Sequence, residues 1–291
     1  MKQLRGTGVA MVTPFNEDKS INFTQLEKLT EHLIAGGVDY LVVMGTTGET
    51  VTLTKEEKKE VLDTVLKVNN GRLPVVLGAG GNNTVEVCRQ LESLDTTGIA
   101  AILSVSPAYN KPTQAGIYAH YKAVAESSPL PVILYNVPGR TSSNIAAETT
   151  LRLANDFENI IGVKEASGSI EQAISILKDR PEGFLVISGD DVLSLPIIAC
   201  GGDGVISVVA NALPQQFSSL VRAALNEDYA TAKKLQYALF DIINALFEEG
   251  NPAGVKKTLM LLGVCNDFVR LPLVEASDKL SAKLKNLLSK L

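Results

Sequence analysis

The chain has 291 residues, enough for one large domain or two of ordinary size, and 45% of them are hydrophobic, so a substantial core can be buried. Its 27 basic and 32 acidic side chains are mixed along the sequence and give a net charge of −5. This balance excludes the basic stripe of a nucleic-acid-binding protein, and no apolar run reaches the length of a membrane-spanning helix.

The few cysteines and histidines argue against a disulfide framework and against a zinc site. Cys88, Cys200 and Cys265 are odd in number and far apart, and neither His32 nor His120 has a nearby cysteine or an HExxH pattern. The N-terminus begins with polar residues and lacks the apolar segment of a signal peptide. These features predict a globular protein of a reducing compartment, the cytoplasm.

Apolar and amphipathic segments alternate along most of the chain. Eight short apolar runs, bounded by turn-forming residues, are predicted to be strands; they cover residues 8–15, 40–44, 75–77, 99–105, 132–135, 160–167, 184–188 and 204–209. Helical spacing predicts helices between them; these cover residues 22–35, 84–94, 113–126, 146–154, 169–178, 191–200 and 214–226, with a further one from 54. Asn22 and Thr54 are the predicted N-caps of the first two helices.

Strands that are apolar on both faces belong to parallel sheets covered by helices. Eight strand–helix units predict a closed (β/α)8 TIM barrel over residues 1–226, and no GxGxxG follows the first strand as a dinucleotide-binding open sheet would require. The alternation of strands and helices stops after residue 226. Residues 227–291 are predicted to form a C-terminal extension of about three helices, at 229–249, 253–262 and 274–290, that covers the barrel or contacts another subunit.

A lysine within the predicted strand at 160–167 is the first candidate for chemistry. Side chains in a strand alternate, so Ile161 and Val163 are expected on one face and Gly162 and Lys164 on the other. Apolar neighbours lower the pKa of a lysine, and the neutral amine attacks carbonyl carbons to form a Schiff base. The alternative is a strand-end lysine that reaches water along its methylene groups.

Other polar groups follow the predicted strands at the end where the active site of such a barrel lies. They are Thr46, Thr47 and Glu49 after the second strand, Tyr109 after the fourth, Tyr135 and Arg140 at the fifth, and Gly189, Asp190 and Asp191 after the seventh. An amine, phenols, hydroxyls and a guanidinium thus converge on one face of the barrel. This convergence favours Schiff-base chemistry over the strand-end alternative.

Each of these groups also has a purely structural alternative. The hydroxyls of Thr46 and Thr47 can close a turn, or they can hold a carboxylate together with backbone N–H groups. Tyr135 can be a core residue, or a proton-transfer group beside the amine. Arg140 can be a solvated charge, or a bidentate ligand for a carboxylate.

The acidic residues near these strand ends are expected to be structural. Glu49 and Glu165 are predicted to hold neighbouring loops. Asp190 and Asp191 are predicted to cap the following helix rather than to bind a metal ion, because no further ligands cluster with them.

Three motifs occur in order on the expected strands: GTTGE at 45–49, YNVPGRT at 135–141 and GVKEAS at 162–167. In this combination the chain resembles the dihydrodipicolinate synthase family of pyruvate-dependent class I aldolases, and the likeness extends over essentially the whole chain. The resemblance implies a lyase that condenses pyruvate with L-aspartate 4-semialdehyde to 4-hydroxy-tetrahydrodipicolinate, in the diaminopimelate route to L-lysine.

The resemblance also implies a role for each catalytic candidate. Lys164 would form the Schiff base with pyruvate, whose carboxylate Thr46 and Thr47 would hold. Tyr135, Thr47 and Tyr109 would form a proton relay, with Tyr109 reaching in from a neighbouring subunit.

The remaining implied features concern the second substrate and the assembly. Arg140 would bind the carboxylate of L-aspartate 4-semialdehyde, and Gly189 and Ile206 would shape the pocket through their backbone. No metal ion or organic cofactor is implied, because the lysine itself is the electron sink. The likeness implies a homotetramer built from tight dimers, with no nucleic-acid or membrane partner.

Two alternatives remain open at the level of sequence. N-acetylneuraminate lyases and 2-keto-3-deoxy sugar acid aldolases share the lysine, the tyrosine and the GxxGE frame, although Arg140 and the paired threonines favour the synthase. A barrel that only binds a keto acid is the alternative from another class. Borohydride reduction in the presence of pyruvate distinguishes a catalyst from such a binder.

The chain departs from lysine-inhibited members of the family, which bind the end product at a subunit interface. Asn82 and Glu86 match polar positions of that site, but Ala108 replaces a tyrosine, and Lys55 and Lys58 replace histidines. Two added cations repel a cationic amino acid, and the missing ring removes packing area. We therefore expect weak or absent inhibition by L-lysine.

Overall fold

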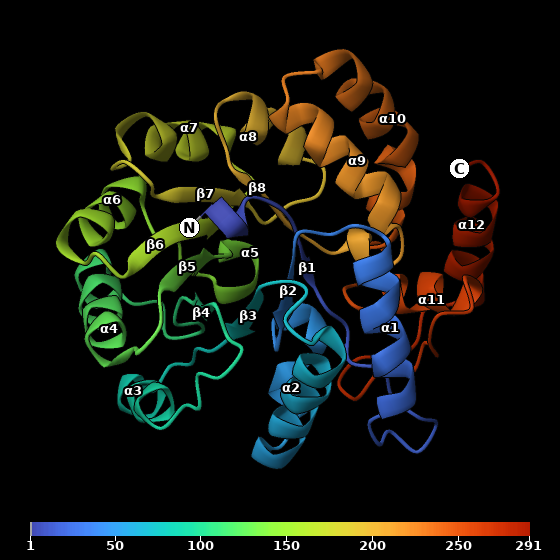
Figure 1. Ribbon diagram of the computed structural model, residues 1–291, viewed down its shortest axis with the longest axis horizontal. Helices are drawn as coiled ribbons and strands as arrows, with labels where there is room; N and C mark the ends of the chain where they lie inside the picture. Colours follow the sequence, from blue (N-terminus) through green and yellow to red (C-terminus); the bar gives the residue numbers. More distant parts are fainter. Residues whose placement is uncertain (1) are drawn as a thin grey trace.

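A computed structural model describes residues 2–291 and confirms the closed parallel barrel (Figure 1). The eight strands follow one another around the barrel in sequence order, and β8 pairs with β1, with Gly8 opposite Ile206. The strands are β1 Gly6–Ala10, β2 Tyr40–Val43, β3 Val75–Gly78, β4 Ala101–Val105, β5 Val132–Asn136, β6 Ile160–Glu165, β7 Leu185–Ser188 and β8 Gly204–Ser207.

Helices cover the outside of this barrel. They are α1 Phe23–Ala35, α2 Lys55–Asn69, α3 Thr84–Glu92, α4 Gln114–Ser127, α6 Ala147–Asp156, α7 Ile170–Asp179, α8 Ser194–Ala199 and α9 Pro214–Leu225, whereas the single turn α5 Pro138–Thr141 lies at the end of β5. Both predicted N-caps are confirmed, because Asn22 accepts a hydrogen bond from the Gln25 N–H and Thr54 forms a reciprocal capping box with Glu57.

The first strand is shorter than the sequence predicts and ends at Ala10. Beyond it the backbone finds other partners, because the Val12 N–H donates to the side chain of Asn211 at 3.1 Å. Phe15 then pairs with Ile21 in an isolated antiparallel bridge. The apolar run therefore continues past the strand into buried loop.

The alternation expected for β6 is wrong. Ile161 belongs to the apolar cluster inside the barrel, whereas Val163 belongs to the cluster between strands and helices. The register with β5 shifts here: Val132 pairs with Ile160, but the next residue of β5 pairs with Gly162. The extra residue in β6 is a bulge, which resets the alternation of faces.

Short elements at the strand ends were not predicted. They are the one-turn helix α5 and three 3-10 turns, Thr46–Gly48, Thr50–Thr52 and Val209–Asn211. Elements of three or four residues are too short to show helical periodicity in the sequence. Both the turns and α5 lie next to the candidate site residues.

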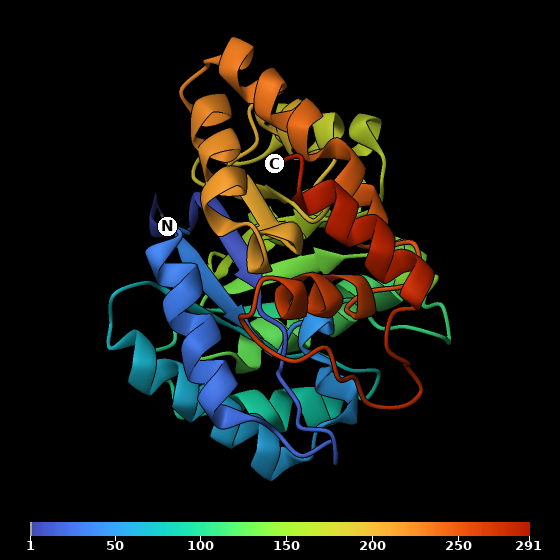
Figure 2. The same ribbon diagram turned by 90° about the vertical axis from the view of Figure 1, so that its right-hand side faces the viewer.

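The C-terminal extension consists of α10 Tyr229–Ala245, α11 Ala253–Leu261 and α12 Asp278–Leu288, gathered on one side of the barrel (Figures 1 and 2). α10 packs against α9, and α12 packs across α10 and α11. Among residues 2–291 there is no helix with the length and apolar character needed to cross a membrane.

Candidate active site

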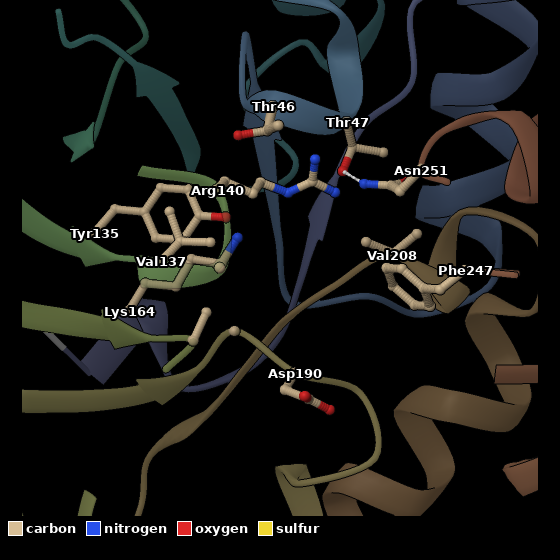
Figure 3. A pocket seen from close by; sticks show the side chains of 13 residues that line it. Thr46, Thr47, Tyr135, Val137, Arg140, Lys164, Asp190, Val208, Phe247 and Asn251 are labelled. Carbon is tan, nitrogen blue, oxygen red and sulfur yellow. Dashed lines mark hydrogen bonds between the residues drawn. The ribbon is translucent and has the colours of Figure 1, made fainter. Parts of the chain in front are cut away.

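A cavity of about 360 Å³ lies at the C-terminal ends of the strands and collects residues from the loops after β2, β5, β6, β7 and β8 and from the C-terminal extension (Figure 3). The residues that line it are Thr46, Thr47, Tyr135, Val137, Gly139, Arg140, Lys164, Ala166, Gly189, Asp190, Val208, Phe247 and Asn251. Most of the site residues predicted from the sequence therefore line the same cavity.

Lys164 is buried at the end of β6, with 5% of its surface exposed. It lies opposite Tyr135 in the register of β5 and β6, and its Nζ is 4.2 Å from the centre of the Tyr135 ring (Figure 3). The bulge in β6 comes before Lys164, so the shifted register is the one that places Lys164 opposite Tyr135. A primary amine and a tyrosine ring therefore lie side by side at the cavity wall.

The loop after β2 presents Thr46 and Thr47 to the cavity from a 3-10 turn. This turn is held from two sides. The Thr13 hydroxyl donates to the carbonyl of Gly48 at 2.7 Å, and the Asn251 side-chain amide donates to Oγ1 of Thr47 at 2.9 Å. These two contacts hold the turn and the Thr47 hydroxyl in place.

Arg140 reaches the cavity from α5, the single helical turn that follows β5. Pro138 occupies the start of this turn, where its fixed φ angle suits a helix, and Ser142 ends it in a left-handed conformation. The guanidinium extends over the cavity towards Thr46 and Thr47 (Figure 3), and the residue is exposed. The entrance of the cavity is therefore cationic and suited to a carboxylate.

Gly189 leaves the room that the Lys164 side chain occupies. A Cβ atom at this position would lie 2.6 Å from Cβ of Ala166 and 3.1 Å from Cε of Lys164. The Gly189 N–H donates to the carbonyl of Glu165 at 2.7 Å, so its backbone cannot easily withdraw. A side chain here would therefore clash with Ala166 and crowd the Lys164 side chain.

Glu49 holds loops together, as predicted. It is 2% exposed, and its carboxylate forms an ion pair with Nζ of Lys256 at 2.5 Å and accepts the Arg270 N–H at 2.9 Å. Burial lowers the pKa of Lys256, and the charge of Glu49 opposes that shift. The contact joins the loop after β2 to α11 of the extension.

Glu165 has the corresponding role between β5, β6 and α7, again as predicted. Its carboxylate accepts hydrogen bonds from Asn136 at 3.0 Å, from Gln172 at 2.9 Å and from the Ser167 N–H at 2.7 Å. These contacts fix the end of β6 directly after Lys164.

The expected capping of α8 by Asp190 and Asp191 is wrong, because the N-cap of α8 is Leu193 and no side chain caps it. Oδ1 of Asp190 instead accepts hydrogen bonds from the N–H groups two and three residues further on, within the turn before α8. Asp191 instead crosses to the loop after β8, where its Oδ2 accepts the N–H groups of Val208 at 3.1 Å and Val209 at 2.9 Å. Burial raises the pKa of Asp191 to about 6.

Two sequence-predicted residues do not line this cavity. Tyr109 is 90% exposed in the loop after β4; its φ is +67°, and its N–H donates to the carbonyl of Thr141 at 3.1 Å. Ile206 is 1% exposed and belongs to the apolar cluster inside the barrel.

Four of the residues that the resemblance compares with a lysine-binding site contact one another. Asn82 and Ala108 exchange two hydrogen bonds, of 2.6 and 2.8 Å, between the Asn82 side chain and the Ala108 backbone. Lys55 Nζ lies 3.6 Å from a carboxylate oxygen of Glu86. Asn82 thus uses its side-chain amide within the chain, and Lys55 and Glu86 form an exposed ion pair.

The contribution of the extension to the cavity wall was not predicted from the sequence. Phe247 and Asn251 come from the segment between α10 and α11, and Val208 follows β8. The only sequence signal at this point is the Asn251-Pro252 pair, which separates two predicted helices. It gives no hint that the asparagine meets a loop about two hundred residues earlier.

The groups in this cavity suit one type of chemistry. A buried amine can add to a ketone, a phenol beside it can transfer protons, and hydroxyls and a guanidinium can bind carboxylates. A (β/α)8 barrel with this set at the C-terminal ends of its strands defines the class of Schiff-base-forming lyases and aldolases.

Comparison with known proteins identifies the family. The model of the dihydrodipicolinate synthetase family matches residues 3–291, and the chain belongs to this family. The 4-hydroxy-tetrahydrodipicolinate synthase of Flavobacterium psychrophilum is 53% identical over 284 residues, covering 98% of this chain and 97% of the relative. The chain is an enzyme of this family.

Solved structures agree with this assignment. The dihydrodipicolinate synthase of Aquifex aeolicus has a TM-score of 0.95 at 41% identity, with 99% of this chain and 98% of that chain covered. The chloride-inhibited dihydrodipicolinate synthase of Acinetobacter baumannii, complexed with pyruvate, has a TM-score of 0.95 at 39% identity, with the same coverage.

Proposed function

We propose that the enzyme condenses pyruvate with L-aspartate 4-semialdehyde to 4-hydroxy-tetrahydrodipicolinate, in the diaminopimelate route to L-lysine. Family membership and the names of the relatives support this substrate pair. The observation that carries the proposal is the buried amine of Lys164 beside the Tyr135 ring, in a cavity whose entrance is cationic.

The reaction begins at Lys164. Its neutral amine adds to the ketone carbon of pyruvate, and loss of water leaves an imine. Loss of a methyl proton gives the enamine, whose carbon attacks the aldehyde of the second substrate and forms the new carbon–carbon bond. The amine of that substrate then adds to the imine carbon, closes the ring and releases Lys164 as a free amine.

The threonine loop and the phenols supply binding and proton transfer. Thr46 and Thr47 bind the carboxylate of pyruvate through hydroxyl and backbone N–H groups. Tyr135, Thr47 and Tyr109 move protons during imine formation and ring closure. Tyr109 is exposed on its own subunit, which supports a role in the cavity of a neighbouring one.

The second substrate is recognised at the cavity entrance. Arg140 binds its carboxylate, as its position over the cavity supports. Gly189 shapes the pocket through the space that it leaves for Lys164, and Ile206 supports the pocket from the barrel interior. No resident metal ion or organic cofactor takes part, because the protonated imine accepts the electron pair.

The assembly and the location follow from the same proposal. Sharing of Tyr109 requires at least a dimer, and we propose a homotetramer of tight dimers in the cytoplasm. Within each subunit we propose a barrel over residues 1–226 and an extension over 227–291 that completes the cavity through Phe247 and Asn251.

A direct assay separates this proposal from its alternative. The purified enzyme is offered pyruvate with L-aspartate 4-semialdehyde, and separately N-acetylneuraminate or a 2-keto-3-deoxy sugar acid. The proposal requires turnover of the first pair at a rate far above cleavage of the sugar acids. The reverse preference would assign the chain to the sugar-acid aldolases, and no turnover with any of them would indicate a binding protein.

A further inference from the structure

The turn Thr46–Gly48 is entered through a backbone conformation that a residue with a side chain rarely adopts. Met44, the residue between β2 and Gly45, has a φ of +62° and is 4% exposed. This left-handed conformation is unfavourable for methionine, so neighbouring groups must hold it. At Gly45 the φ returns to −73°, and the turn begins. The bend at Met44 therefore sets the direction in which the turn leaves the barrel.

Gly78, the last residue of β3, leaves the space for this bend. A Cβ atom at Gly78 would lie 2.6 Å from the carbonyl carbon of Met44 and 3.0 Å from the nitrogen of Gly45, and closer still to the Met44 carbonyl oxygen. All three atoms belong to one peptide group, which cannot swing aside as the end of a flexible side chain can. The φ of Gly78 is outside the left-handed region, so glycine is needed here for room and not for its own conformation.

The backbone of β3 cannot easily retreat from that peptide group, because strands pair with it on both sides. On one side Leu77 pairs with Val43 of β2. On the other side Gly78 pairs with Leu103 of β4, and the Leu103 carbonyl accepts the N–H of Ala79 at 2.9 Å. A side chain at position 78 would therefore displace the peptide group before the turn and leave the sheet in place.

The far end of the turn is fixed independently. Glu49, which ends the turn, also has a positive φ, of +53°, and its buried carboxylate is held by Lys256 of α11. A displacement that begins at Met44 is therefore absorbed between these two points. Thr46 and Thr47 lie between them and line the cavity (Figure 3).

We propose that Gly78 is a positioning residue for the carboxylate of pyruvate. The space above its α-carbon admits the peptide group that begins the turn, and that peptide group sets where Thr46 and Thr47 present their hydroxyl and N–H groups. Gly78 itself lies outside the set of residues that line the cavity. The inference rests on the proposed function, because it assumes that this turn binds the pyruvate carboxylate.

The variant Gly78→Ala tests the inference with one added methyl group. The enzyme is labelled with borohydride at increasing pyruvate concentrations, and the concentration that gives half the maximal rate of labelling at Lys164 is measured. We expect this concentration to rise at least about tenfold, because a misplacement of about 1 Å can cost a factor of about a hundred. A loss of stability cannot imitate this result, since an unfolded fraction lowers the amount of label without moving the half-saturating concentration.

Two further variants identify the cause. Gly81→Ala makes the same change three residues later, where a Cβ atom would lie 3.5 Å from the Val87 side chain, an ordinary van der Waals contact. The half-saturating pyruvate concentration of this control should equal that of the wild type. Met44→Gly in the Gly78→Ala background lets the peptide group turn another way, because glycine adopts conformations closed to methionine. The double variant should recover most of the lost affinity for pyruvate.

The outcomes that overturn the inference differ from the one that overturns the proposed function. The inference fails if Gly78→Ala keeps the wild-type half-saturating concentration, or if Gly81→Ala raises it as much. It also fails if the double variant recovers no affinity or, where Gly78→Ala alone does not fold, if adding Met44→Gly does not restore the fold. Absence of label at Lys164 in the wild type refutes the Schiff-base route itself, whatever the variants show.

Discussion

Replacing Lys256 by methionine should destabilise the protein strongly, because it leaves the carboxylate of Glu49 buried without its cation. The two side chains are 0% and 1% exposed and 2.5 Å apart. Methionine fills a similar volume, so the loss reports on charge more than on a cavity. Removing one partner of a buried ion pair costs about 3–5 kcal/mol.

Other contacts of the pair place the expected loss within that range. Glu49 keeps the hydrogen bond from the Arg270 N–H, which reduces the loss. The ammonium of Lys256 also lies 4.1 Å from the centre of the Phe15 ring and donates to the Phe268 carbonyl at 2.8 Å, and both contacts disappear. We expect about 4 kcal/mol, or a melting temperature lowered by roughly 10 °C.

A double-mutant cycle checks the cause. Urea unfolding is measured for Lys256→Met, Glu49→Gln and the double variant at one protein concentration, because assembly shifts apparent stability. The double variant should lose at least about 1 kcal/mol less than the sum of the two single variants, since it leaves no unpaired charge. Additive losses, or a Lys256→Met protein as stable as the wild type, would refute the argument.

Three further predictions concern the cavity and the subunit interface. Arg140→Ala should raise KM for the aldehyde substrate far more than it weakens pyruvate trapping at Lys164; equal losses would mean that the arginine does not bind the second substrate. L-lysine should inhibit weakly or not at all, because Lys55 pairs with Glu86; near-complete inhibition at sub-millimolar lysine in a steady-state assay would contradict this. Burial raises the pKa of Asp191 to about 6. Between about pH 4 and 6 the folded protein therefore keeps a proton on Asp191 that the unfolded chain has lost. The free energy of unfolding should decrease by about 3 kcal/mol as the pH rises through this window. Asp191→Asn should remove that decrease from urea unfolding curves, and parallel pH profiles of the two proteins would speak against it.

The barrel could be predicted because its signals are local and repeated. Each strand is a short apolar run followed by a helical pattern, and Asn22 and Thr54 begin their helices with the side-chain contacts that such residues make. The place of Lys164 followed from the rule that barrel active sites lie at the C-terminal strand ends. These inferences needed only the period of the pattern and the order of the elements.

The features that escaped prediction depend on contacts between distant segments. The bulge at Ile161 is set by the register with β5 and has no mark in the sequence of β6 itself. Asp191 reaches a neighbouring loop instead of its own helix. Asn251 meets Thr47 only because the extension folds back over the strand ends. None of these contacts produces a periodic pattern that a single sequence could reveal.

Reductive trapping tests the central claim most directly. The enzyme is incubated with pyruvate, reduced with borohydride, digested and analysed by mass spectrometry. The account predicts one reduced pyruvyl adduct, on the peptide that contains Lys164, and none in a Lys164→Ala variant that keeps its circular dichroism spectrum and lacks turnover. An adduct on a different lysine, or an unmodified wild-type enzyme that still turns over both substrates, would contradict it.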